Sequence, residues 1–123
     1  MKQAQLQKIS DHVYWMPPAA PDRPSLCAVV GPEKTVMLDA GASAAHARQF
    51  LGQLESIGVS RPEEVVLTHW HWDHVFGAAE VGAKVIAQRL TAAKLAEISA
   101  RDWSDAGLEQ QVVAGLETEK GAE

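Results

Sequence analysis

Residues 68–74 of the chain read Thr-His-Trp-His-Trp-Asp-His and carry its strongest chemical signal. Three of the chain's five histidines fall within this stretch, beside a carboxylate. A His-x-His-x-Asp-His string arises by chance on the order of once in a few thousand chains of this composition. The alternative is a run of surface histidines or a buried, hydrogen-bonded imidazole pair, and the spacing favours a metal site over both.

The residues before this stretch explain how the side chains would converge. Residues 65–68 form a short apolar run, typical of a strand that is covered on both faces. Because side chains two apart on a strand point the same way, His69 and His71 are expected to aim nitrogens at one cation. If the chain then bends, Asp73 and His74 reach a second cation nearby. Such nitrogen and oxygen ligands suit zinc, and iron or manganese less specifically.

The other aromatic, imidazole and thiol side chains predict structural roles. Trp70 and Trp72 alternate with the candidate ligands, so we expect them to point the other way and to pack in the core. His12 and His46 have no carboxylate or cysteine at ligand spacing and are expected to be ordinary surface histidines. Cys27, the single cysteine, has no partner for an internal disulfide and is expected to be a small buried hydrophobe.

Working outward, the sequence pattern predicts strands followed by alternating helices and strands. Short apolar runs predict a meander of hairpins, with strands at residues 5–9, 12–16, 26–30 and 34–38. A proline-rich segment, 17–25, predicts an exposed loop. Ser43 is a candidate N-cap of a helix that Gly58 ends, and the next strand, 65–68, would then pair in parallel through a right-handed crossover. Further elements are expected downstream, namely a short helix over 75–80, a strand at 84–87, and helices over 88–99 and 104–117.

Length and composition restrict the class of protein. With 123 residues, 46% hydrophobic and 22% charged, the chain is predicted to form a single domain, residues 1–123, and is unlike a disordered chain. Neither a leader-like apolar region nor a membrane-spanning stretch is found, so a cytoplasmic location without a membrane partner is expected. The 11 basic and 16 acidic residues form no basic cluster, which argues against nucleic acid as a partner.

Residues 68–74, together with Leu38-Asp39-Ala40-Gly41 about thirty residues earlier, resemble the signature of the metallo-β-lactamase superfamily. The predicted order of elements over residues 5–90 agrees with the hairpins, Asp-x-Gly turn, helix and strand that open this fold. The resemblance implies an α/β fold, a metallo-β-lactamase-like αββα sandwich, of which this chain is expected to contain only the amino-terminal half.

The resemblance also implies a metal-dependent hydrolase. Carried over by position, it makes His69 and His71 ligands of a first zinc, and Asp73 and His74 ligands of a second. Asp39 would contact a ligand rather than a metal, and Asp73 would orient a metal-bound hydroxide that attacks an ester, thioester, lactone or β-lactam carbonyl of a small molecule. A histidine at position 71 favours the hydrolase branch over oxygen-handling di-iron members, but iron-dependent relatives share the motif, so the metal stays open.

One departure from the family pattern leaves two functional hypotheses. The family's complete binuclear site takes two more histidines and a bridging carboxylate from a second half, yet no histidine follows His74, and Asp102 and Asp105 match no ligand pattern. Each metal would have at most two protein ligands, so an isolated monomer is not expected to be fully active. The chain is therefore either part of a hydrolase whose carboxyl-terminal half is missing, or a non-catalytic half domain that pairs with another copy or a partner and binds metal weakly. A metal-binding or transport role without chemistry is a third, weaker hypothesis.

Overall fold

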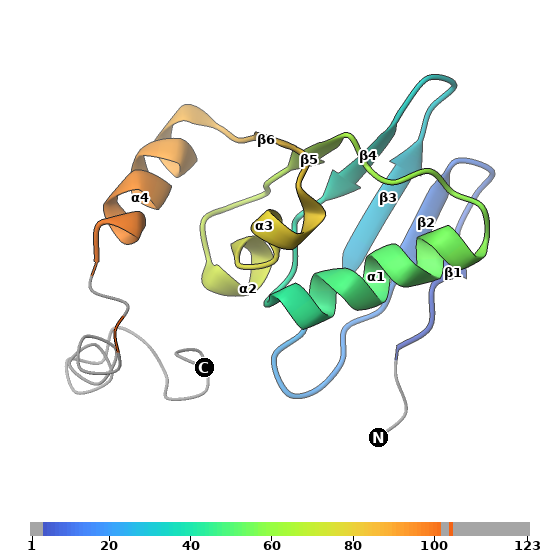
Figure 1. Ribbon diagram of the computed structural model, residues 1–123, viewed down its shortest axis with the longest axis horizontal. Helices are drawn as coiled ribbons and strands as arrows, with labels where there is room; N and C mark the ends of the chain where they lie inside the picture. Colours follow the sequence, from blue (N-terminus) through green and yellow to red (C-terminus); the bar gives the residue numbers. More distant parts are fainter. Residues whose placement is uncertain (1–3, 102–103, 105–123) are drawn as a thin grey trace. The chain divides into compact units, whose positions relative to one another are not determined.

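The computed structural model describes residues 4–101 and 104 (Figure 1). By its internal contacts the chain divides into two compact units, Met1–Gln88 and Arg89–Glu123. In its described residues the first unit holds a six-stranded sheet with helices α1, α2 and α3, and the second holds α4 (Arg89–Ser99). The expected helix over 104–117 lies outside the described residues apart from Ser104, as do Asp102 and Asp105. A single domain stays a prediction.

The strands follow one another across the sheet in sequence order. Strands β1 to β4 form antiparallel hairpins, whereas β5 and β6 run parallel to β4. This arrangement confirms the predicted meander and the predicted parallel pair. Strand β5 ends two residues earlier than the expected strand 65–68, which leaves Leu67 and Thr68 in the loop that follows it. The strand bounds are β1 (Gln7–Lys8), β2 (Val13–Met16), β3 (Leu26–Val30), β4 (Thr35–Leu38), β5 (Glu64–Val66) and β6 (Lys84–Ile86).

Helix α1 (Ala44–Ser56) begins and ends where its sequence signals predict. The Ser43 hydroxyl accepts a hydrogen bond from the His46 backbone N–H at 3.1 Å, which caps the first turn. Gly58, with φ 78°, follows the last turn in the left-handed conformation that glycine adopts at little cost. The short helix expected over 75–80 is instead two, α2 (Trp72–Val75) and α3 (Ala78–Val81), with Gly77 between them.

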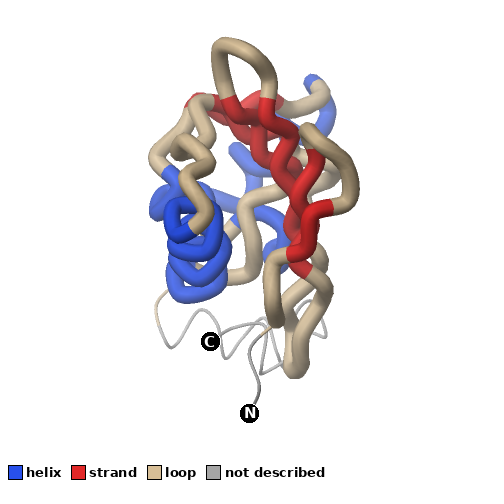
Figure 2. Tube along the Cα trace, turned by 90° about the vertical axis from the view of Figure 1, so that its right-hand side faces the viewer, coloured by secondary structure: helices blue, strands red, loops and turns tan. Residues whose placement is uncertain are grey.

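The core of the first unit lies between α1 and one face of the sheet. Figure 2 shows the strands nearly edge-on with α1 along one side. Phe50 and Leu54 project from α1 and are almost completely buried. Full burial of each such side chain contributes roughly 1.5–3 kcal/mol. The sheet meets them with buried residues at alternate strand positions, namely Met16, Leu26, Ala28, Met37 and Val65.

The opposite sheet face carries a row of half-buried apolar side chains. The strand register pairs Trp15 with Cys27, Cys27 with Leu38, and Leu38 with Val66. Cys27 is therefore half-buried rather than buried as expected, because it points away from α1; partial burial still raises the pKa of its thiol. Among residues 4–101 and 104, no helix has the length and apolar character needed to cross a membrane.

Candidate metal centre

The turn that follows β4 is the base of the candidate site. Asp39 has φ 61° and Gly41 has φ 93°, so two of its three residues adopt left-handed backbone conformations. The Asp39 N–H donates to the carbonyl of Val66 at the end of β5 (2.9 Å), and the Ala40 N–H donates to the carbonyl of His74 (2.8 Å). The turn is thus tied to the end of the strand and to the histidine-rich segment at once.

Gly77 allows this segment to approach the turn closely. Its N–H donates to the carbonyl of Gly41 at 3.0 Å. A methyl group at this position would overlap with the Ala40 carbonyl oxygen and lie 3.0 Å from the Ala47 methyl group. Only glycine fits between the turn and α1, and nothing in the sequence pattern had marked this position.

The Asp39 carboxylate is the hub of the hydrogen bonds at the site. It is 6% exposed, and it accepts hydrogen bonds from two residues of the histidine-rich segment. The Thr68 N–H donates to Oδ1 at 2.8 Å, and the Thr68 hydroxyl lies 3.0 Å from Oδ1 and 2.8 Å from Oδ2. Nδ1 of His74 lies 2.8 Å from Oδ2. Asp39 thus contacts His74 directly, and its role behind a metal ligand stays a prediction.

The same hydrogen bonds select which nitrogen each imidazole presents. A carboxylate only accepts, so neutral His74 donates from Nδ1 to Asp39 and keeps its lone pair on Nε2. The single hydroxyl proton of Thr68 goes to Asp39, so Thr68 accepts from Nδ1 of His69 at 2.8 Å. Both histidines therefore present Nε2 as the free donor atom, the form a metal binds.

The three imidazoles of the segment lie together at the start of α2. The ring centroid of His69 is 4.7 Å from that of His71 and 4.2 Å from that of His74. Burial lowers the pKa of His69, and the nearby His74 and His71 lower it further, against the opposing effect of Asp39 and Asp73. A lowered pKa favours the neutral, metal-binding form. Asp73 is 31% exposed, with Oδ2 3.6 Å from Nε2 of His74.

One pair of donor atoms has a separation that fits two ligands of one metal ion. Within the described part of the chain, no three His, Cys, Asp or Glu side chains form a ready-made metal site. The 3.6 Å between Nε2 of His74 and Oδ2 of Asp73 is close to the separation of about 3.4 Å for two ligands on one tetrahedral zinc with bonds of about 2.0–2.1 Å. The structure brings all five predicted site residues together, and their role as zinc ligands stays a prediction.

The two tryptophans of the segment lie outside the core. Trp70 and Trp72 were expected to pack in the core. Both are half-buried instead, and neither is part of the buried core. The Trp70 ring meets the His71 ring edge-on at a centroid distance of 4.7 Å, and the Trp72 ring lies 6.0 Å from that of Phe76. They stay outside the core because the segment is a loop and a short helix at the end of the sheet, where strand alternation no longer applies.

The structure adds two residues that sequence reasoning left without a role. Thr68 bridges Asp39 and His69, a role that its place before the histidines does not predict. His46, expected at the surface, is 1% exposed. Its place four residues before Phe50, on the buried stripe of α1, is the signal that would have identified it. His12 is exposed, as expected.

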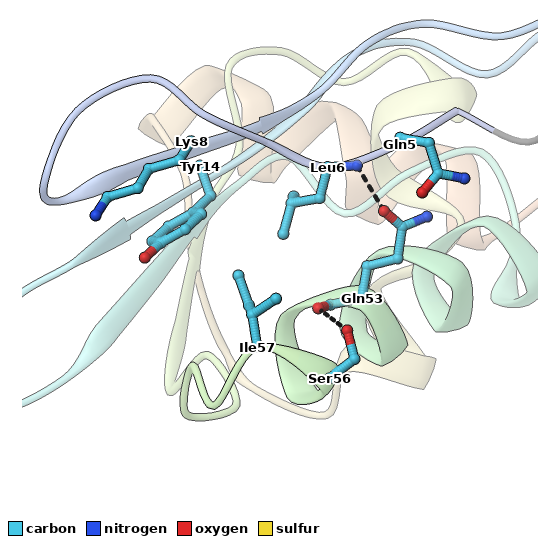
Figure 3. A pocket seen from close by; sticks show the side chains of 7 residues that line it. All are labelled: Gln5, Leu6, Lys8, Tyr14, Gln53, Ser56 and Ile57. Carbon is cyan, nitrogen blue, oxygen red and sulfur yellow. Dashed lines mark hydrogen bonds between the residues drawn. The ribbon is translucent and has the colours of Figure 1, made fainter.

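A separate cavity lies at the other end of α1 and offers no metal ligands. Figure 3 shows Leu6 and Ile57 projecting toward each other across it, with Gln53 accepting a hydrogen bond from the Leu6 N–H at 2.6 Å. Its volume is about 390 Å³. Its lining contains no imidazole, thiol or carboxylate and consists of Gln5, Leu6, Lys8, Tyr14, Gln53, Ser56 and Ile57. This cavity is therefore not a candidate metal site.

Comparison with known proteins identifies the family and the fold. The family model described as the metallo-beta-lactamase superfamily, a generally metal-dependent family, matches residues 20–119. A metallo-beta-lactamase from Pontibacter korlensis is 26% identical with a TM-score of 0.67, the match covering 79% of this chain and 49% of that one. A HARLDQ motif mutant of the Cronobacter sakazakii metallo-beta-lactamase is 25% identical with a TM-score of 0.65, over 81% of this chain and 40% of that one.

A third structure supports the fold alone. The metallo-beta-lactamase from Hirschia baltica is 17% identical with a TM-score of 0.66, and the match covers 80% of this chain and 49% of that one. No curated protein matches the sequence. The chain spans between 40% and 49% of the length of these three solved structures. The α/β architecture is thus that of a metallo-beta-lactamase fold over the part that the match covers.

Proposed function

Because the chain belongs to the metallo-beta-lactamase superfamily, we propose that it is part of a metal-dependent hydrolase in which His69, His71, Asp73 and His74 bind metal. The observation that carries this proposal is the buried Asp39 carboxylate. It fixes Thr68 and His74 so that donor nitrogens of two histidines are free at one place. Hydrogen bonds from a carboxylate to the rear nitrogen of a ligating histidine are typical of metal centres.

Zinc is the metal that this donor set fits best. The candidate ligands are imidazole nitrogens and a carboxylate oxygen, with no thiolate among them. We assign His69 and His71 to a first ion, and Asp73 and His74 to a second. Each ion then has two of the three protein ligands that catalytic zinc usually keeps. The complete site would take its further ligands from outside the described residues, in another part of the fold or in a second copy.

The residues of the chain have distinct tasks in the proposed hydrolysis. A bound metal supplies Lewis acidity, which lowers the pKa of water and polarises a carbonyl oxygen. Asp39 keeps the proton of His74 on Nδ1, and Thr68 keeps that of His69 on Nδ1, so that both Nε2 atoms remain donors. Asp73 orients the attacking water by accepting its hydrogen bond. The substrate class we propose is a small molecule with an ester, thioester, lactone or β-lactam carbonyl.

The first test is metal content. The chain is loaded with zinc and freed of excess metal, and the zinc per chain is measured by elemental analysis. The wild type is compared with the His69→Ala/His71→Ala double variant, and with His12→Ala, an exposed histidine remote in sequence from the site. We expect close to two zinc ions in the wild type and in His12→Ala, and a clear loss in the double variant. Zinc near zero in all three would refute the proposed metal centre.

The second test is activity toward carbonyl substrates. The zinc-loaded wild type is assayed with an ester, a thioester, a lactone and a β-lactam, at several protein concentrations. Hydrolysis that depends on His69 and His71 supports the reaction class. Specific activity that falls on dilution indicates that a second copy completes the site, since dilution dissociates a dimer. Bound zinc with no hydrolysis of any substrate would favour the non-catalytic half domain instead.

A further inference from the structure

His46 is a buried imidazole that the proposed reaction does not use. It lies in the first turn of α1 and is 1% exposed. Its Nδ1 atom is 3.1 Å from the Ala42 backbone nitrogen, which donates a hydrogen bond to it. A methyl group added to Gly41 would lie 3.0 Å from the same Nδ1 atom. The His46 ring therefore packs closely against the turn formed by residues 39–42.

The hydrogen bonding of the His46 ring indicates that the side chain is needed for its acceptor atom Nδ1. Because Nδ1 accepts the Ala42 N–H, the ring proton is on Nε2. That Nε2 is the buried side-chain polar atom, among residues 4–101 and 104, that has no hydrogen-bond partner. An unsatisfied buried donor lowers stability, and leucine would fill a similar volume without that cost. Packing alone therefore does not explain a histidine here, whereas its acceptor for Ala42 does.

The charge state of His46 agrees with this role. Burial above all, and then electrostatic repulsion from Arg23 and from the nearby His74 ring, lowers the pKa of His46 to about 4. The ring is therefore neutral around neutral pH. A neutral imidazole keeps the lone pair on Nδ1 that the Ala42 N–H needs.

The turn that His46 holds is the one that aims Asp39. Asp39 has φ 61°, a conformation that non-glycine residues keep only when surrounding contacts hold it. Val66 and His74 provide two of these contacts through backbone hydrogen bonds, and His46 provides the one from α1. The Asp39 carboxylate in turn holds Nδ1 of His74 at 2.8 Å.

We propose that His46 is a positioning residue of the metal centre: its Nδ1 holds the Ala42 N–H, which keeps the turn in the shape that directs the Asp39 carboxylate to His74. This inference rests on the proposed function only where metal affinity is concerned. Loss of the Nδ1 acceptor should weaken zinc binding about tenfold, the lower end of the range for residues behind a metal ligand. It should also allow His74 in the metal-free chain to adopt both tautomers, instead of only the one with the proton on Nδ1.

The test compares two amides that place their polar end at different points. In His46→Asn the side-chain oxygen takes the place of Nδ1 and still accepts from Ala42. In His46→Gln the amide lies near the place of Nε2, so the Ala42 N–H loses its acceptor. A third variant, His46→Leu, keeps the volume but removes every acceptor. Zinc affinity is measured by competition with a chromophoric chelator, and folding by urea unfolding.

A second readout needs no metal. The tautomer of His74 is measured by ¹⁵N NMR of the metal-free chain, at a pH well above the ordinary histidine pKa of about 6.5. We expect the wild type and His46→Asn to keep the proton on Nδ1, and His46→Gln and His46→Leu to show a mixture of both tautomers. A side chain that only filled space would leave this signature unchanged.

The outcomes separate this inference from the proposed function. Zinc affinity and the Nδ1 tautomer retained in His46→Asn but reduced in His46→Gln support the positioning role. Equal behaviour of the two amides, or changes that follow only their stabilities, overturn it. If the wild type binds no zinc but the tautomer still changes with position 46, the proposed metal centre fails while the positioning of Asp39 stands. If His46→Leu does not fold, the two amides decide.

Discussion

Replacement of Gly77 by alanine tests the close approach on which the site is built. The added methyl group would overlap with the carbonyl oxygen of Ala40 and crowd the Ala47 methyl group, 3.0 Å away. Ala40 is itself held in place, because its own N–H donates to the carbonyl of His74 at 2.8 Å. Because backbone in a bonded turn has no rotamer to change, the turn or α3 must move.

The size of the effect follows from two opposing terms. Overpacking by a methyl group costs about 1–3 kcal/mol of unfolding free energy. Because the added methyl group would meet the rigid backbone of Ala40, we expect a cost at the upper end of this range. Gly77 has φ −83°, which alanine adopts without strain, so the smaller entropy of the unfolded chain returns about 0.4–1 kcal/mol. We expect Gly77→Ala to lose about 2 kcal/mol of unfolding free energy, roughly 1 M in urea midpoint.

A matched substitution elsewhere in the chain predicts the opposite sign. Gly52 lies within α1, and a methyl group added there would have no neighbour within 4 Å. Gly52→Ala should therefore stabilise the chain by about 0.5–1 kcal/mol, because glycine is a poor helix former. Urea unfolding followed by circular dichroism measures both variants. A Gly77→Ala midpoint at or above that of the wild type, with Gly52→Ala behaving as expected, would refute the close approach.

Two further predictions concern the polar groups of the site. Asp39→Asn should weaken zinc binding about 10- to 100-fold, because an amide no longer provides two acceptor oxygens for Thr68 and His74. Zinc affinity is measured by competition with a chelator. The control Asp11→Asn, at an exposed position, should leave zinc affinity unchanged. Stability should fall as the pH drops from 6.5 to about 4, because His46 in the unfolded chain takes up a proton that the folded chain, with its pKa lowered to about 4 by burial, does not. The full difference between the folded and unfolded pKa of His46 lowers the unfolding free energy by roughly 3 kcal/mol. Urea midpoints across this pH range should therefore depend less steeply on pH in His46→Asn than in the wild type. Equal slopes would contradict the assignment of this pH dependence to His46.

The candidate site shows how far local sequence signals reach. The histidine-rich segment and the Ser43 cap were identified from spacing, because ligand clusters and helix caps are encoded by residues a few positions apart. The Asp39 turn was identified through the resemblance to the family. The strands were found for the same reason, within one or two residues at most ends. The direction of Trp70 and Trp72 was predicted wrongly, because there the chain leaves the strand and its two-residue alternation no longer sets the direction of side chains.

The sequence by itself determined the order of the strands, the start of α1 and the family to which the chain belongs. Only the tertiary structure decided which atoms those elements bring together. Asp39 and His74 are 35 positions apart, and their hydrogen bond exists because β4 and β5 are adjacent and parallel. His46 is buried because α1 lies with that side against the turn, and Gly77 is required because two backbones meet there. Contacts between distant segments depend on how whole elements pack, which no local pattern of residues specifies.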